Sequence, residues 1–390
     1  MKLYVLLAAI ITFAFFSNDF GLVDIQKTAI ILAAGIDKTE TGFSLTTQIA
    51  VPKGSDRSTG GTSSVEIEAE GETVSDCVSL IYSKTGWVPK LVFCNLILLG
   101  EDAVKEDVIS YLNYFLRNEY MNDSCQLAVC EGKAKDVIES QSAIDDTSSL
   151  AIEKLFSDAA QKAGRVMQNT LKDFAIGYYG VSKSSYLPYV RMADQKGAQS
   201  GGAASASGNG GSGGQSGGGS GAESEKVYSA EETALFQDGK MVELLTREQT
   251  LALSLLKGNV ESGTFNADDK GNNVTLTVLK NKGGVSLEMK GVPTAKLSLD
   301  LTVRLCCRGT TAPIEDIASD SVSPEVLESA KTVLQGYITE LWDKTKECGC
   351  DLFDLTTSLY RSSLKKFAEW MDYLLTSVEP KIETNVKSMN

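Results

Sequence analysis

Hydrophobic and polar residues alternate most regularly near the start of the chain, in residues 24–52. An apolar block at residues 29–36 is followed by a polar turn at 37–42, and residues 43–51 then alternate between apolar and polar side chains. A short apolar run beside a segment of period two, with Gly and charged residues between them, is typical of a β-hairpin. We therefore predict a hairpin over residues 24–52 in which one strand is buried on both faces.

The first half of the chain continues as strands and helices. Residues 65–70 alternate between apolar residues and Glu66, Glu68 and Glu70, which predicts a half-exposed strand. Glutamates in this pattern resemble paired carboxylates for acid–base catalysis, but a spacing of two also places them on one solvated strand face, which we favour. Residues 91–99 form a nearly continuous apolar run, typical of a strand covered on both faces.

The second half opens with a hairpin and a helix. Asp238 and Gly239 lie between two alternating segments, and this dipeptide predicts a hairpin with a type I′ turn. A capping-box pattern begins at Thr246, where a hydroxyl is followed three residues later by Gln249. It predicts a helix that runs through residue 256.

Three amphipathic segments follow, at residues 274–278, 285–289 and 295–305, with a turn expected at Gly283 and Gly284 between the first two. Each places apolar residues on one face and polar residues on the other, which indicates an antiparallel sheet that is wet on one side. A long helix is predicted to follow and to cover the apolar face of this sheet. The whole pattern predicts an α+β fold, with mixed or antiparallel sheets covered by helices.

Residues 197–221 are almost entirely Gly, Ser and Ala. Such a segment cannot bury enough apolar surface to offset the entropy lost on ordering, so we expect a disordered Gly/Ser linker at residues 196–226. As a tether it would join an N-terminal domain, residues 21–195, to a C-terminal domain, residues 227–390, and would let the two contact partners at different places. The alternative is a long loop inserted into one compact body.

An apolar run from Leu3 to Phe16 follows a lysine at the N-terminus. As a helix these 14 residues would be about 21 Å long, against about 30 Å for the hydrocarbon core of a bilayer. The run therefore fits the apolar region of a signal peptide better than a full membrane span. We expect residues 1–20 to be a signal-like segment or membrane anchor, either retained or cleaved.

Composition excludes several classes of function. The chain contains no histidine, which removes Ser-His-Asp and Cys-His catalysis and histidine-ligated zinc. Its net charge of −14 argues against binding of nucleic acid, which requires clustered Lys and Arg. The eight cysteines include no CxxC pair, and we expect mostly reduced, partly buried thiols, with one or two disulfides as the alternative. We identify no catalytic, cofactor-binding or metal-binding residue.

Several motifs together resemble a known family. The hairpin sequence of residues 24–52, "YLNYFLR" at 111–117 and "GKAKDVI" at 132–138 are similar to the GerAC-type spore germination proteins, the C subunits of spore germinant receptors. This resemblance implies a non-enzymatic, membrane-associated subunit that acts in spore germination by assembly and signalling with membrane-embedded A- and B-type subunits. It also implies a place on the extracytoplasmic face of the spore inner membrane.

The lipid-bearing cysteine of that family is replaced in this chain. Counting back from Gly35 places it at Asp19, so the resemblance implies no lipid attachment here. Membrane association would then depend on the anchor from Leu3 to Phe16.

Two functions of other classes stay open. An extracytoplasmic small-molecule-binding protein would have a pocket with converging polar groups. A hydrolase that uses Asp/Glu pairs would need carboxylates of different pKa in a cleft, and the sequence singles out no such pair.

Overall fold

The computed structural model describes residues 4, 28–51, 63–194, 225–289, 292–308, 322–371 and 373–389. The predicted anchor with Leu3 and Phe16, the substituted position Asp19 and the Gly/Ser segment lie outside these residues, as do the two ends of the predicted hairpin. No helix in the described part of the chain combines the length and the apolar character that crossing a membrane requires.

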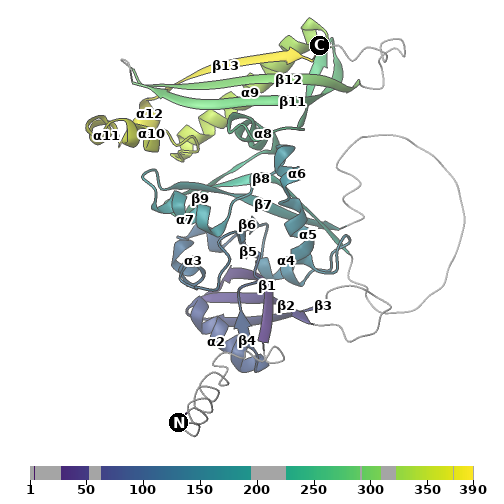
Figure 1. The fold of residues 1–390 in the computed structure, drawn as a ribbon, viewed down its shortest axis with the longest axis vertical. Helices are drawn as coiled ribbons and strands as arrows, with labels where there is room; N and C mark the ends of the chain where they lie inside the picture. Colours follow the sequence, from purple (N-terminus) through teal and green to yellow (C-terminus); the bar gives the residue numbers. More distant parts are fainter. Residues whose placement is uncertain are drawn as a thin grey trace, which may run out of the picture.

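The chain forms two sheets that follow one another along the long axis of the molecule (Figure 1). The first has the order β3-β2-β1-β5-β6-β7-β8-β9, with β4 paired to β1, and the second has the order β10-β11-β12-β13. The first sheet contains β1 (Thr28–Lys38), β2 (Phe43–Val51), β3 (Ser63–Gly71), β4 (Val88–Lys90), β5 (Leu96–Leu99), β6 (Gln126–Cys130), β7 (Ser184–Asp194), β8 (Lys226–Gln237) and β9 (Lys240–Leu245). The second contains β10 (Thr264–Asp269), β11 (Asn272–Glu288), β12 (Thr294–Arg308) and β13 (Glu379–Ser388).

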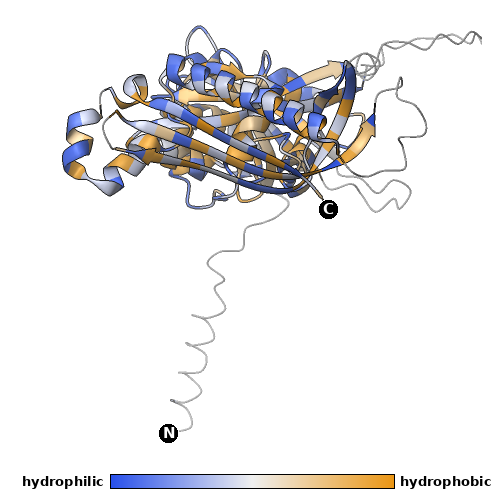
Figure 2. Ribbon diagram, turned by 90° about the horizontal axis from the view of Figure 1, so that it is seen from above, coloured by the Kyte–Doolittle hydropathy of each residue, from blue (hydrophilic) through white to orange (hydrophobic). Residues whose placement is uncertain are grey.

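Helices cover both faces of the first sheet and one face of the second. Their bounds are α2 (Val74–Thr85), η2 (Ala103–Lys105), α3 (Ile109–Leu116), α4 (Ala134–Glu139), α5 (Ser148–Leu155), α6 (Asp158–Lys162), α7 (Leu171–Tyr179), α8 (Arg247–Leu256), α9 (Pro324–Cys348), α10 (Leu355–Ser362), α11 (Leu364–Trp370) and α12 (Leu374–Ser377). Side chains from α2, α3 and α7 share one hydrophobic core with the first sheet, and α4 and α5 share another. Hydrophobic and hydrophilic residues alternate along the strands of the second sheet, as its burial pattern requires (Figure 2). The expected α+β fold is confirmed.

The predicted N-terminal hairpin is confirmed over the residues that the structure describes. β1 and β2 pair antiparallel, with Ile36 opposite Leu45, and both strands are largely buried. The polar face of β2 is buried as well, which its alternation did not predict. Gln48 on that face is only 1% exposed, and its side-chain amide donates to the carbonyl of Ile138 at 3.3 Å and accepts from the backbone of Ser149.

Asp37, at the end of β1, caps a helix from another part of the chain. α4 has no side-chain cap of its own, and the carboxylate of Asp37 accepts from the backbone N–H groups of Ala134 at 2.8 Å and Lys135 at 2.9 Å. Burial raises the pKa of Asp37 more than these hydrogen bonds lower it. The close approach needs Gly35, because a Cβ there would come within 2.7 Å of the side chain of Ile138. The motifs at 24–52 and 132–138 are therefore one structural unit.

The strand predicted at residues 91–99 is shorter than expected. Only Leu96–Leu99 form β5, and residues 91–95 are a turn and loop. Leu91 and Cys94 point into the core, whereas Val92 and Phe93 are exposed. An apolar run alone does not distinguish a buried strand from a loop that buries only some of its apolar side chains.

The turn predicted at Gly283 and Gly284 is wrong, because β11 continues through both residues. Gly283 meets the end of α8 instead: a Cβ there would lie 1.9 Å from the carbonyl oxygen of Leu255. The side chain of Asn281 donates to that same oxygen at 3.0 Å. The glycine permits close contact between helix and strand rather than a reversal of the chain.

The two strands that follow the Gly/Ser segment belong to the first sheet. β8 pairs antiparallel with β7 from Ser184 opposite Gln237 to Asp194 opposite Lys226. β8 and β9 fall within the predicted C-terminal domain, residues 227–390, but they pair within the first sheet, and the second sheet begins only after Leu245. The segment thus connects neighbouring strands of one sheet, and it is not a tether between the two sheets.

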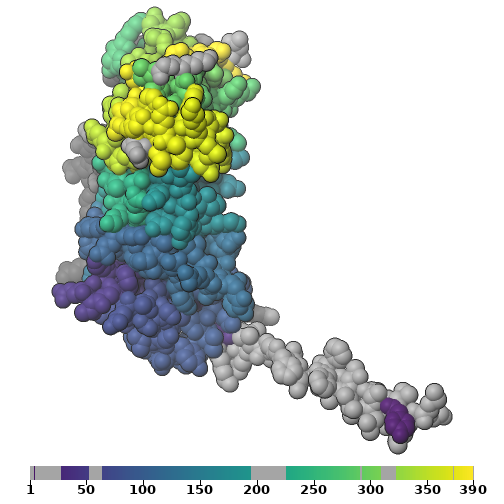
Figure 3. Space-filling model, turned by 90° about the vertical axis from the view of Figure 1, so that its left-hand side faces the viewer, coloured from purple at the N-terminus to yellow at the C-terminus, as the bar shows by residue number. Residues whose placement is uncertain are grey.

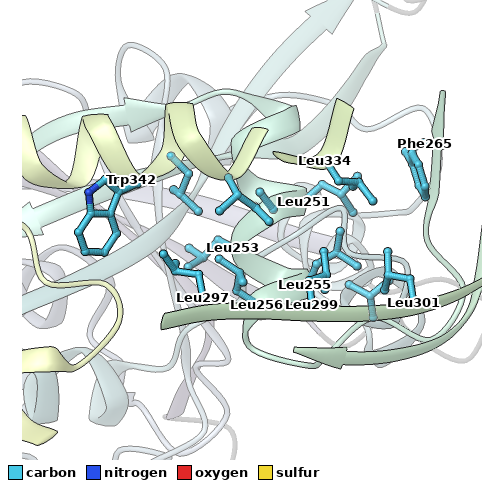
Figure 4. Close-up of a cluster of buried hydrophobic side chains, with 14 of the residues drawn as sticks. Leu251, Leu253, Leu255, Leu256, Phe265, Leu297, Leu299, Leu301, Leu334 and Trp342 are labelled. Atoms are coloured by element: carbon cyan, nitrogen blue, oxygen red, sulfur yellow. The ribbon is translucent and has the colours of Figure 1, made fainter. Parts of the chain in front are cut away.

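Helix α8 joins the two sheets by being buried between them. It contacts β8 and β9 of the first sheet and β11, β12 and helix α9 of the second part. Leu253 and Leu255 are fully buried, and they share one hydrophobic core with Leu235 of the first sheet and Leu297 of the second (Figure 4). The two parts therefore form one elongated body, with the N-terminal residues at one end and the C-terminal part at the other (Figure 3).

Removal of residues 197–221 should leave the fold intact, because the ends of this segment are held by paired strands. Loop-closure entropy predicts a gain of about 1–1.5 kcal/mol in the free energy of unfolding for the shorter connection. Chemical denaturation of the deletion variant and of a variant with the same segment in scrambled order would measure it. Loss of cooperative unfolding in the deletion variant alone would contradict the β7–β8 pairing.

Replacement of Asp37 should destabilise the first part of the protein. Asp37→Ala leaves two buried N–H groups at the start of α4 without an acceptor, which predicts a loss of about 2–4 kcal/mol, and Asp37→Asn should lose less. Asp102→Ala is the matched control, because Asp102 is exposed in an ion pair with Lys105 and its removal should leave the unfolding midpoint nearly unchanged. Equal unfolding midpoints for the two alanine variants would show that Asp37 does not cap α4.

Candidate functional site

A polar cleft lies where the first sheet meets the C-terminal helices, and we call it the junction cleft. Its volume is about 200 Å³. Three distant stretches of chain form it. They are β7 with Ser184 and Tyr186, Lys257 after α8, and the Cys350–Asp354 turn before α10. The residues that line it are Asn169, Asp173, Ile176, Gly177, Ser184, Ser185, Tyr186, Lys257, Asp351, Leu352 and Asp354.

Asp351 lines one side of the junction cleft and has a structural role. It is 3% exposed, and its carboxylate accepts from the backbone N–H groups of Leu355 at 2.9 Å and Thr356 at 2.7 Å, at the start of α10. Its own backbone N–H donates to the hydroxyl of Ser184 at 2.9 Å, across the junction. Asp351 therefore both caps a helix and ties the second part to β7.

Lys257 supplies the positive charge of the junction cleft. Its ammonium group lies over the ring of Tyr186, 5.0 Å from the ring centroid, and has no hydrogen-bond acceptor among the described residues. Burial lowers the pKa of Lys257, while Asp354 and Asp351 act in the opposite direction. Burial also raises the pKa of Tyr186 to about 12, so the phenol stays neutral.

Asp354 supplies a second charge at the same cleft. Its backbone lies in the left-handed region, with φ of 54°, and its side chain makes no capping hydrogen bond to α10. Burial raises the pKa of Asp354, and Lys257 lowers it. The junction cleft thus presents an ammonium group and a carboxylate, with no hydrogen bond between the two among the described residues.

Other groups singled out in the sequence are used in packing. Glu68 accepts from Ser44 at 2.8 Å and pairs with Lys135, and the hydrogen bond from Lys135 holds the pKa of Glu68 below its usual range. Glu66 accepts from the side chain of Gln48 at 2.9 Å. Glu66 and Glu68 are thus held by hydrogen bonds and an ion pair, and they are less solvated than predicted.

The tyrosines near Pro188 do not gather in one pocket. Tyr189 packs in the core of the first part, Tyr186 faces the junction, and Tyr178 donates to Asp107 at 3.0 Å. These tyrosines therefore serve packing at separate places and do not form a single aromatic ligand site among the described residues.

The eight cysteines are free thiols in the structure. Within the described residues, no group of three or more His, Cys, Asp or Glu is placed to hold a metal ion. The predicted anchor residues Leu3 and Phe16 and the substituted Asp19 are outside the described residues, so their roles stay predictions.

Sequence reasoning missed the junction cleft. The sequence pattern predicted a helix through residue 256, and it gave no role to Lys257 or to Asp351 and Asp354. The sequence carried one weak signal. The helix before Lys257 has no continuous polar face, which places the ammonium group of Lys257 near buried surface.

Comparison with known proteins gives matches over both parts of the chain. The family model described as spore germination protein N-terminal domain matches residues 22–192, and the model described as spore germination B3/GerAC like, C-terminal, matches residues 231–389. The boundary between these models falls near the Gly/Ser segment.

A curated relative and a solved structure are also similar. Spore germination protein B3 of Bacillus subtilis (strain 168) is 24% identical over 266 residues, which cover 66% of this chain and 62% of that protein. The chain thus matches less than two thirds of that relative's length. The crystal structure of the GerBC protein aligns with a TM-score of 0.49 and 17% identity, over 92% of this chain and 97% of that one. The chain belongs to the GerAC-like family of spore germination proteins.

Proposed function

We propose that this protein is a non-enzymatic C-type subunit of a spore germinant receptor, which acts through contact with membrane-embedded A- and B-type subunits. The observation that carries the proposal is the match of two consecutive family models, one to each part of the chain. The role in spore germination follows from the family. Assembly with particular subunits and signalling at a membrane are the parts that we propose.

The proposed location is the extracytoplasmic face of the spore inner membrane, with the segment from Leu3 to Phe16 as the anchor. Asp19 stands where the family carries its lipid-bearing cysteine, so the apolar segment is the source of attachment in this chain. A non-enzymatic role is supported by the structural roles of two buried carboxylates. Asp37 and Asp351 both accept backbone hydrogen bonds at helix starts, which gives each of them a structural role.

The shared core changes how such a subunit would work. Because α8 packs against both sheets, partners bound to the first and second parts would be held in one fixed relation. A contact at one end can then be transmitted to the other end as a movement of one body, without a flexible tether between them.

Purification from spore membranes tests the assembly. A tagged chain, expressed in a sporulating host that carries its receptor genes and solubilised in mild detergent, should recover polytopic A- and B-type subunits. Spores that lack the chain should lose their response to the corresponding nutrient. A variant without residues 1–20 is the control, and it should be absent from the membrane fraction. Recovery of the full-length chain alone, together with normal germination of the deletion spores, would contradict the proposal.

A second candidate function is binding of a small molecule in the junction cleft. The ammonium of Lys257 is the observation that favours it, because this half-buried cation faces the cleft with no hydrogen-bond acceptor among the described residues. A small carboxylate would provide that acceptor.

Thermal unfolding with small carboxylates such as glutamate or citrate tests this candidate. Binding to the folded state should raise the Tm of the wild type with ligand concentration. Lys257→Met should remove the increase, whereas Lys346→Met, at an exposed lysine of α9, should keep it. Equal shifts in the wild type and both variants would place the binding elsewhere and end this candidate.

A further inference from the structure

Four large apolar or aromatic side chains are exposed at one end of the first part. Val88 is 42% exposed, Val92 47%, Phe93 55% and Tyr120 57%. We call these four residues the edge patch. Single exposed apolar residues are normal on a protein surface, but three of these four fall within six consecutive positions.

The topology of the sheet brings the edge patch together. β1, β5 and β6 are parallel, so their N-terminal ends meet at one edge, where Thr28 pairs with Val88 and Leu96 pairs with Gln126. The loop before β5 carries Val92 and Phe93, and the loop before β6 carries Tyr120. The ammonium of Lys90, the last residue of β4, lies 5.2 Å from the centre of the Tyr120 ring, which connects β4 with the loop before β6.

The exposure does not follow from poor packing of these loops. Leu91 and Cys94 are 4% and 0% exposed, so the loop is fixed to the core at both sides of the exposed pair. Full burial of Val92 or Phe93 would stabilise the protein through the hydrophobic effect, and the isolated fold lacks this contribution. A firmly held loop that presents apolar side chains outward is suited to contact with another apolar surface.

β1, the first described strand, begins at the same edge. β1 begins at Thr28, and only residues 17–27 connect it to the apolar run from Leu3 to Phe16. Even fully extended, that connection reaches at most about 40 Å. A bilayer that holds the apolar run is therefore within reach of the edge patch. The short connection gives the edge patch a high local concentration at the bilayer surface.

The chemistry of the edge patch fits the boundary between lipid and water. Aromatic rings and a lysine beside apolar residues are the combination found at membrane interfaces. Glu119 next to Tyr120 offsets the charge of Lys90, so the patch has no excess of positive charge for attraction to anionic lipid. Apolar contact with the acyl boundary is the expected interaction.

We propose that the edge patch rests on the surface of the lipid bilayer and fixes how the protein stands on the membrane. The inference depends on the membrane anchor of the proposed function and extends it. The anchor alone leaves the body free to rotate, and contact through Val88, Val92, Phe93 and Tyr120 would restrict that freedom. A receptor subunit that covers the same residues is the competing occupant.

Quenching by brominated lipid tests the proposal on the full-length chain. Phe93→Trp would be reconstituted in phosphatidylcholine vesicles with and without brominated acyl chains, and its fluorescence compared with the wild type. Leu364→Trp is the matched control, because Leu364 is 66% exposed on α11 in the second part, at the far end of the body. Bromolipid should remove most of the fluorescence added by Trp at 93 and none of that added at 364. Adding Val92→Asp to Phe93→Trp should restore the lost fluorescence.

Flotation of the same vesicles separates the possible failures. Protein that does not float with the vesicles would overturn the anchor, and with it the proposed function at a membrane. Protein that floats without quenching at position 93 would overturn the edge patch alone. Quenching in vesicles that disappears when A- and B-type subunits are added would assign the patch to a protein partner in the assembled receptor, and would also overturn the proposal.

Discussion

Burial of α8 between the two sheets is the interaction on which the rest of the structure depends. Its leucines face the first sheet on one side and β11, β12 and α9 on the other, and each contributes about 1.5–3 kcal/mol through burial. Even its polar side chains are enclosed, as the hydroxyls of Thr250 and Thr233 lie 3.0 Å apart in the interior. Without this helix, the hydrophobic core that joins the two sheets would be incomplete, whereas the two cores of the first sheet contain no residue of α8.

The helix also explains several features of its neighbours. Gly283 is required because the end of α8 presses its carbonyl groups against β11. The junction cleft lies beside that same end, so Lys257 is brought to Tyr186 by the packing of α8 rather than by local sequence. The geometry of the cleft and the relative position of the two sheets are thus set together.

Features that depend on adjacent residues were predicted well from the sequence, whereas features that depend on tertiary packing were not. The capping box at Thr246 and the turn at Asp238 and Gly239 were predicted because both depend on a few adjacent residues, and the structure has both. The loop at residues 91–95 was taken for a strand, since periodicity does not reveal which apolar side chains find a core. The junction cleft could not be predicted, because Ser184, Lys257 and Asp351 meet only through the packing of distant elements.

The connection between β7 and β8 starts and ends at paired residues, Asp194 and Lys226, at the end of their ladder. The free energy of closing such a loop grows only with the logarithm of its length, by about 0.6 kcal/mol for each doubling. Gain or loss of a few Gly or Ser residues in this segment would therefore hardly alter folding. Selection for stability therefore acts only weakly on the length of this segment. The length can change during evolution while the sheet on either side stays the same.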